Sequence, residues 1–149
     1  MLTPLHVTLH AGPPTGISSA TRLPVTRVAG GDVAPLNLSS ADLQGSFGES
    51  FEDAAEFLSR LARLYFEPDG SFVWVGDEDG DGSSWQFDGV LYDRGGRLQY
   101  MELKGDGPLA AWQQLRAVLG PPGTLVVAHF VYEGRFVDLD EWLKSPRHR

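Results

Sequence analysis

The sequence predicts an α/β fold, with α+β as the alternative: a layered mixed sheet of at least four strands flanked by helices. Two observations predict it. After residue 48, helix and strand patterns alternate in the order helix, strand, strand, strand, helix, strand. The segment 85–92 also carries apolar residues on both faces, so both faces call for cover. These residues are Phe87 and Leu91 on one face and Val90 and Tyr92 on the other.

Length and composition indicate one globular domain. The chain has 149 residues, of which 42% are hydrophobic and 21% are charged, which suits a single domain with a sizeable core. Its formal net charge of -8 would repel a phosphate backbone, so nucleic acid is a disfavoured partner and a basic protein a favoured one. Because the chain has no cysteine, disulfides and thiolate chemistry are excluded.

The sequence also predicts where the protein resides. Residues 1–10 lack the basic and apolar blocks of a signal peptide. No apolar run reaches the roughly 20 residues that a membrane span needs. We therefore expect a soluble, cytoplasmic protein with no membrane partner.

The first 47 residues differ in amino-acid composition from the rest of the chain. They are rich in Pro, Gly, Ser and Thr, so we expect an N-terminal extension at 1–47 and a single domain at 48–149. Runs typical of strands at 5–9 and 23–28 could add an edge hairpin to that domain or drape over it.

The first helix is predicted at 51–66. Ser50, followed three residues later by Asp53, forms a variant of the capping box. Apolar side chains then recur at helical spacing, at Phe51, Ala55, Leu58, Ala62 and Tyr65. Pro68, within turn chemistry at 67–70, ends the helix.

The remaining elements follow from strand and breaker patterns. Strands are predicted at 71–75, 85–92 and 97–104, and a helix at 108–119 between Pro108 and the Gly-Pro-Pro-Gly sequence at 120–123. The continuous apolar run at 125–132 predicts a buried strand, and residues 138–144 a short final helix.

A candidate site arises in the hairpin formed by the second and third of these strands. A three-residue loop at 94–96 would set Asp88 directly opposite Glu102, with Lys104 two residues further along the same face. Two carboxylates facing each other at about 5 Å repel, so the arrangement needs a bound cation or the lysine ammonium.

Residues 50–132 resemble the PD-(D/E)xK nuclease superfamily, in element order and in Asp88 followed by Glu102-Leu103-Lys104. The resemblance implies divalent-metal-dependent phosphodiester hydrolysis, with Mg²⁺ or Mn²⁺ held by Asp88 and Glu102. It implies Lys104 as the catalytic lysine. The same resemblance implies an acidic contribution from the first helix and a glutamine from the second, and the matching positions are Glu56 or Glu52 and Gln113 or Gln114.

One departure counts against catalysis. The family's basic residues are absent after Lys104, where Gly105-Asp106-Gly107 adds negative charge beside the proposed phosphate site. The resemblance therefore equally allows a member that has lost activity. The alternative is a non-catalytic acidic module that binds a basic protein, of the inhibitor or immunity type.

A calcium-stabilised structural domain is the third hypothesis. Asp77, Asp79 and Asp81 occupy positions 1, 3 and 5 of a calcium-loop pattern, and Asp88 falls at position 12. The flanks are predicted strands rather than helices, which favours a solvated hairpin loop. Asp88 cannot serve both this loop and a site with Glu102, so the two metal hypotheses exclude each other.

The histidines offer weaker signals. His6 and His10 would share a face in a strand, where two surface histidines are favoured over a zinc pair. His129 lies in the predicted buried strand, so a hydrogen-bonded core histidine is expected there.

Overall fold

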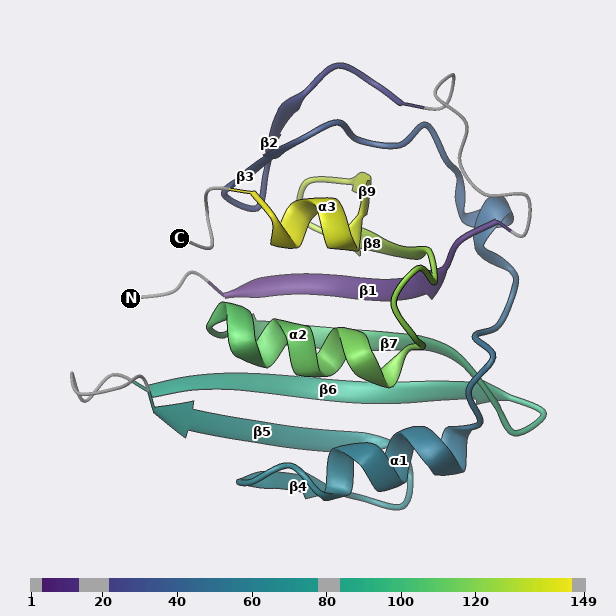
Figure 1. The fold of residues 1–149 in the computed structure, drawn as a ribbon, viewed down its shortest axis with the longest axis vertical. Coiled ribbons are helices and arrows are strands. Elements are labelled where there is room, and N and C mark those ends of the chain that lie inside the picture. The colour runs from purple at the N-terminus through teal and green to yellow at the C-terminus, as the bar shows by residue number, and fades with distance from the viewer. Residues whose placement is uncertain (1–3, 14–21, 78–83, 146–149) are drawn as a thin grey trace.

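The computed structural model describes residues 4–13, 22–77 and 84–145. Its main feature is a seven-stranded sheet in which neighbouring strands follow the order β4-β5-β6-β7-β1-β8-β9 (Figure 1). Every neighbouring pair is antiparallel. The strands are β1 (Leu5–Ala11), β4 (Leu64–Phe66), β5 (Ser71–Asp77), β6 (Ser84–Arg94), β7 (Arg97–Asp106), β8 (Val126–Phe130) and β9 (Arg135–Asp138).

The described α-helices lie on one face of this sheet. In Figure 1, α1 (Phe51–Ser59) lies over the β4–β5 edge, α2 (Leu109–Val118) over the middle, and α3 (Leu139–Leu143) over the β8 side. The strand residues that point toward them are buried, and together with the helices they form the core. Examples are Val7, Leu9, Phe72, Phe87, Leu91, Met101 and Leu103.

The prediction of a mixed sheet flanked by helices is therefore wrong. The described residues are mostly β, with 44% in strands against 22% in helices, and the seven-stranded sheet is antiparallel. The apolar residues on the second face of β6 do not imply a second layer of cover: Tyr92 is 36% exposed there, while Phe87 and Leu91 are buried under the helices. Antiparallel sheets tolerate one solvated face, and Val and Tyr suit strands even when partly exposed.

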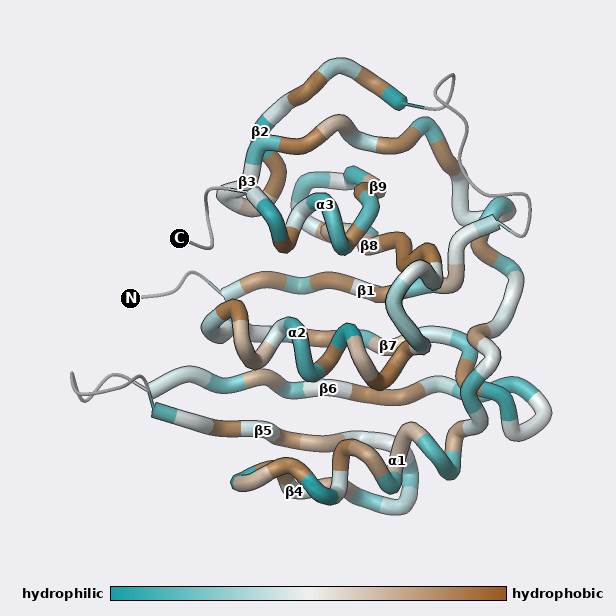
Figure 2. The backbone as a smooth tube through the Cα atoms, in the orientation of Figure 1, coloured by the Kyte–Doolittle hydropathy of each residue, from teal (hydrophilic) through white to brown (hydrophobic). Residues whose placement is uncertain are grey.

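Strand β1 is an interior strand and not part of an extension or an edge hairpin. It pairs with β7 on one side and β8 on the other, so the prediction that the run at 5–9 belongs to an extension or an edge hairpin is wrong. Its residues alternate between buried Leu or Val and half-buried His or Thr. The same alternation appears in Figure 2 as a change between hydrophobic and hydrophilic residues along β1. This period of two is the pattern of a strand with one face in the core and one toward solvent.

The segment after β1 wraps around the β9 side of the sheet. A hairpin of β2 (Thr26–Val28) and β3 (Gly31–Val33) packs on α3, where the indole N–H of Trp142 donates to the carbonyl of Val28 at 2.9 Å. Leu36 then bridges to Phe136 of β9, and a 3-10 helix (Ser40–Leu43) follows. Leu36 and Leu43 form a second apolar cluster with Val127.

Helix α1 starts where the sequence predicts and ends earlier. Ser50 Oγ accepts a hydrogen bond from the Asp53 amide at 3.0 Å, so the predicted cap is confirmed. The helix ends at Ser59 instead of residue 66, because Leu64–Phe66 pair with β5 as strand β4. Tyr65, predicted on the apolar stripe of the helix, is 64% exposed on the sheet.

The β6–β7 hairpin forms as predicted, but in a different register. The turn has two residues, Gly95 and Gly96, whose positive φ values of 60° and 83° suit the tight turns that hairpins prefer. A bulge at Tyr92 and Asp93 adds a further shift. The prediction of a three-residue loop is therefore wrong, and Asp88 pairs with Lys104 while Glu102 pairs with Val90.

Candidate functional site

One face of the sheet carries the candidate site. Within the described residues no helix covers the face opposite α1, α2 and α3 between β4 and β1, and we call this the open face (Figure 1). At its β8–β9 end Leu36 and Leu43 cover Val127, which limits the face on that side. Large apolar side chains stay exposed on it, with Tyr65 at 64%, Val73 at 38% and Tyr92 at 36%.

A shallow depression of about 340 Å³ lies on the open face across β4 to β7. We call it the acidic depression, because its described lining contains three carboxylates and one ammonium group. Val73 and Val90 supply apolar surface beside the charged groups. The charged residues are Glu67, Asp88, Glu102 and Lys104.

Three of the predicted site residues meet in this depression. Asp88 and Lys104 are cross-strand neighbours, and Glu102 is diagonal to Asp88 instead of facing it. Diagonal neighbours stand about 7 to 8 Å apart, which relieves most of the repulsion that direct opposition would cause. The Asp88 carboxylate accepts a hydrogen bond from Gln86 Nε2 at 2.9 Å. The need for a cation between the two acids therefore disappears.

The helical residues of the nuclease hypothesis lie on the other side of the sheet. Glu56 belongs to α1 and forms an exposed ion pair with Arg60. Gln113 and Gln114 belong to α2, and Gln113 lines a groove between α2 and α3. The structure thus does not bring them together with Asp88, Glu102 and Lys104. Across the described ranges, no group of three or more His, Asp or Glu side chains is placed to hold a metal ion.

The calcium hypothesis falls largely on residues outside the described ranges, which exclude Asp79 and Asp81. Asp77 ends β5 and forms an ion pair with Arg63 at 3.0 Å. Asp88 pairs with Val73, four residues before Asp77, so the two carboxylates belong to positions about 13 Å apart along the strands. Asp88 therefore does not close a loop on Asp77.

Glu102 is the best-connected carboxylate of the open face. His6 Nε2 donates to Glu102 Oε2 at 2.7 Å, and the Tyr92 hydroxyl donates to Oε1 at 3.2 Å. The hydrogen bond from His6 is the main reason that the pKa of Glu102 lies below its usual value, and Tyr92 and Lys104 add to the effect. Burial and the charge of Glu102 raise the pKa of Tyr92. Glu102 is thus a fixed negative charge at neutral pH.

Beside Glu102, three aromatic rings stack across β6, β7 and β1. The ring centroids of Tyr92 and Tyr100 lie 4.4 Å apart, with 16° between the ring planes. Those of Tyr100 and His10 lie 5.2 Å apart, with 22° between the planes. His10 Nε2 also lies 2.8 Å from Thr8 Oγ1. Tyr100, in the middle of the row, is therefore covered on both ring faces. A nucleic-acid base cannot stack on a ring that is covered on both faces.

His10 makes the stability of the protein depend on pH. Burial, reinforced by the charge of His129, lowers the pKa of His10 from 6.5 to about 4. At a pH between these two pKa values, His10 is mostly protonated in the unfolded chain and mostly neutral in the folded chain. The free energy of unfolding therefore falls as the pH falls. From pH 7.5 to pH 5 we expect His10 to contribute a loss of about 1 kcal/mol, after discounting for partial exposure.

Urea unfolding of the parent and of His10→Gln at the two pH values checks this. The variant should lose less stability than the parent on acidification, by about 1 kcal/mol. Equal losses in the two proteins would contradict the assignment.

The sequence patterns missed the role of β1 in the site. His6, Thr8 and His10 share the open face with Glu102, and the strict alternation of residues 5–10 was the signal that could have placed them. His129 is not a core histidine: it is half-buried on the same face and stacks on Phe136 at 4.5 Å. Within the described residues it makes no side-chain hydrogen bond.

Comparisons with protein-family models, with curated proteins and with solved structures found no match to this chain. Among the described helices, none has the length and apolar character needed to cross a membrane.

Proposed function

We propose that this chain is a non-catalytic binding module whose open face binds a basic protein. The observation that carries the proposal is the acidic depression, where three carboxylates and exposed apolar side chains share one uncovered sheet surface. A Lys or Arg side chain of the partner would enter the depression beside Glu67 and Asp88. Its neighbours would pack on Val73 and Tyr65.

The apolar part of the surface supports a protein partner. Tyr65, Val73 and Tyr92 lie on neighbouring strands and keep between a third and two thirds of their surface exposed. Rigid aromatic and branched side chains on a sheet lose little entropy on binding, and Tyr is enriched at interface centres. Tyr65 also offers a ring face to a cation.

The charge of the molecule supports a basic partner. The described lining of the depression has three acids and one lysine, in a chain whose formal net charge is -8. Complementary potential accelerates the encounter with a basic protein and disfavours acidic ones. Both carboxylate oxygens of Glu102 accept hydrogen bonds, one from His6 and one from Tyr92. Glu102 therefore serves as a stable negative charge rather than as a proton acceptor.

A defined cationic probe tests this proposal. Acetylated hexa-arginine amide is titrated into the parent and into the double variant Glu67→Gln with Asp88→Asn, with calorimetry as the readout. We expect the dissociation constant to rise about tenfold in the variant, since two of the three carboxylates of the depression are neutralised. Backbone NMR signals that shift on binding should map to β4–β7.

The matched control is Glu52→Gln with Glu56→Gln, which has the same net charge as the test variant. Both control positions are exposed on α1, on the other side of the sheet. The control should change the affinity less than about twofold. Equal weakening in the two double variants would show non-specific attraction and would overturn the proposal.

A further inference from the structure

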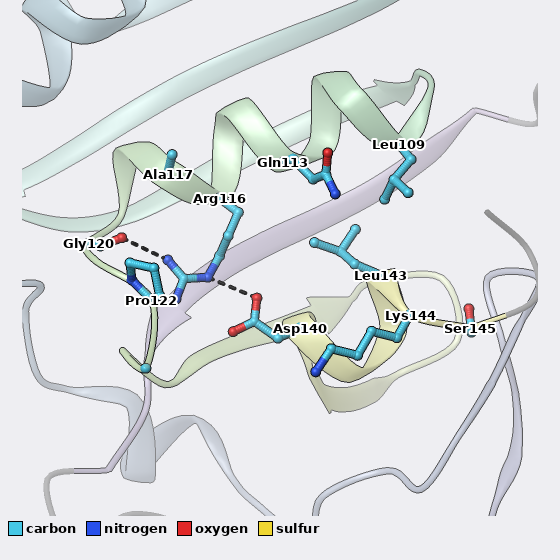
Figure 3. A pocket seen from close by; sticks show the side chains of 11 residues that line it. Leu109, Gln113, Arg116, Ala117, Gly120, Pro122, Asp140, Leu143, Lys144 and Ser145 are labelled. Carbon is cyan, nitrogen blue, oxygen red and sulfur yellow. Dashed lines mark hydrogen bonds and ion pairs between the residues drawn. The ribbon is translucent and has the colours of Figure 1, made fainter. Parts of the chain in front are cut away.

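A second hollow lies on the helical side of the sheet, between α2 and α3 (Figure 3). It has a volume of about 700 Å³, within the range usual for small-molecule sites. Leu109, Gln113 and Ala117 line it from α2, where a spacing of four residues puts them on one stripe of the helix. Leu143 and Lys144 line it from the α3 side, and Leu143 points toward Leu109 in Figure 3.

The groove is preformed, because contacts within the protein hold its walls in place. Trp112 of α2 and Trp142 of α3 are fully buried and meet edge to face at 5.1 Å, so the two helices are held at a constant spacing. Arg116 Nε donates to Asp140 at 3.0 Å, and its other nitrogens donate to the carbonyls of Gly120, Pro121 and Thr124. These bonds hold the loop after α2 as the end wall.

The groove leaves polar groups for a ligand. Within the described residues, Lys144 forms no ion pair within 4.0 Å, and the side-chain amide of Gln113 makes no hydrogen bond. Arg116 and Asp140 neutralise each other, so Lys144 gives the described lining a net positive charge. This positive charge stands out in a chain whose formal net charge is -8. A single anionic group is therefore the charge that the groove complements.

We propose that the groove binds a small molecule with an apolar body and one carboxylate. The body lies along Leu109, Ala117 and Leu143, and the carboxylate pairs with Lys144 at the mouth. Gln113 offers a hydrogen-bond donor from the opposite wall. The apolar walls supply most of the affinity, and the lysine selects the anionic head group.

Octanoate is the probe, and backbone NMR signals of α2 and α3 are the readout. We expect octanoate to shift these signals in a saturable manner. Octyltrimethylammonium, with the same tail and the opposite charge, should bind about tenfold more weakly or not at all. If it binds as tightly as octanoate, or if octanoate shifts no signal of the two helices, the proposal is overturned.

Two variants locate the binding. Ala117→Trp fills the groove from an exposed position and should lower octanoate affinity at least about tenfold. Ala110→Trp, also exposed on α2 but outside the lining, is the matched control and should leave the affinity unchanged. Lys144→Gln, at an exposed position, should weaken octanoate about tenfold and leave 1-octanol binding unchanged, so it tests the head-group site even if Ala117→Trp fails to fold. Unchanged octanoate affinity in Lys144→Gln would overturn the head-group assignment.

Discussion

Replacement of Trp112 by Ala lowers the free energy of unfolding by about 3 to 5 kcal/mol, which is the expected cost of deleting a large aromatic side chain from a core. Trp112 is fully buried, and its ring centroid lies 5.1 Å from that of Phe87 in the sheet. Trp112 also packs against Trp142, so it joins α2 both to the sheet and to α3. Its indole N–H also donates to Asp106 Oδ1 at 3.0 Å. The substitution therefore creates a cavity and removes a hydrogen bond from a buried carboxylate.

Trp112→Phe separates the two contributions. It keeps most of the ring volume and loses the N–H, so we expect a smaller loss of about 1 to 3 kcal/mol. Trp85→Phe is the control, because Trp85 packs on Phe87 from a partly buried position and should cost about 1 kcal/mol or less. Urea unfolding of the four proteins measures the differences. A loss below about 1 kcal/mol in Trp112→Ala would show that α2 is not part of the cooperative core.

Local patterns predicted most elements because their causes are local. The Ser50–Asp53 cap, the Pro108 helix start and the glycine turn of the β6–β7 hairpin each depend on residues a few positions apart. The interior place of β1 depends on pairing with strands that are about a hundred residues away in the chain. A single sequence shows the period of a strand but not its partners, so it predicts an N-terminal extension at 1–47 where the structure has an interior strand.

The site was predicted in part for the same reason. Glu102 and Lys104 lie on one face of the sheet because residues two apart in a strand point the same way. Asp88 lies on the same face because it is the cross-strand partner of Lys104. Whether two of them face each other depends on the turn length and on the bulge, and one extra residue in either changes the pairing. The contact of His6 with Glu102 joins β1 to β7 and therefore depended on the long-range pairing.

Arg116→Met is expected to lower the free energy of unfolding by about 3 to 5 kcal/mol, because it removes four hydrogen bonds that typically contribute about 1 kcal/mol each. Arg116 is 8% exposed and donates to Asp140 and to three loop carbonyls. Methionine fills a similar volume but offers no donor, so Asp140 and the three loop carbonyls all lose their hydrogen bonds to Arg116. Arg116→Lys keeps the charge but cannot span four acceptors with one ammonium, so it should fall between Met and the parent.

The double variant Arg116→Met with Asp140→Asn shows how much of this loss belongs to the ion pair. Asp140 is 38% exposed by its side chain, so its own replacement should cost only about 1 kcal/mol. If the pair matters, the double variant will be more stable than the sum of the two single losses predicts, by about 1 kcal/mol. Strict additivity would instead assign the loss to the carbonyls of Gly120, Pro121 and Thr124. In that case Arg116 stabilises the protein mainly by its hydrogen bonds to the loop that connects α2 to β8.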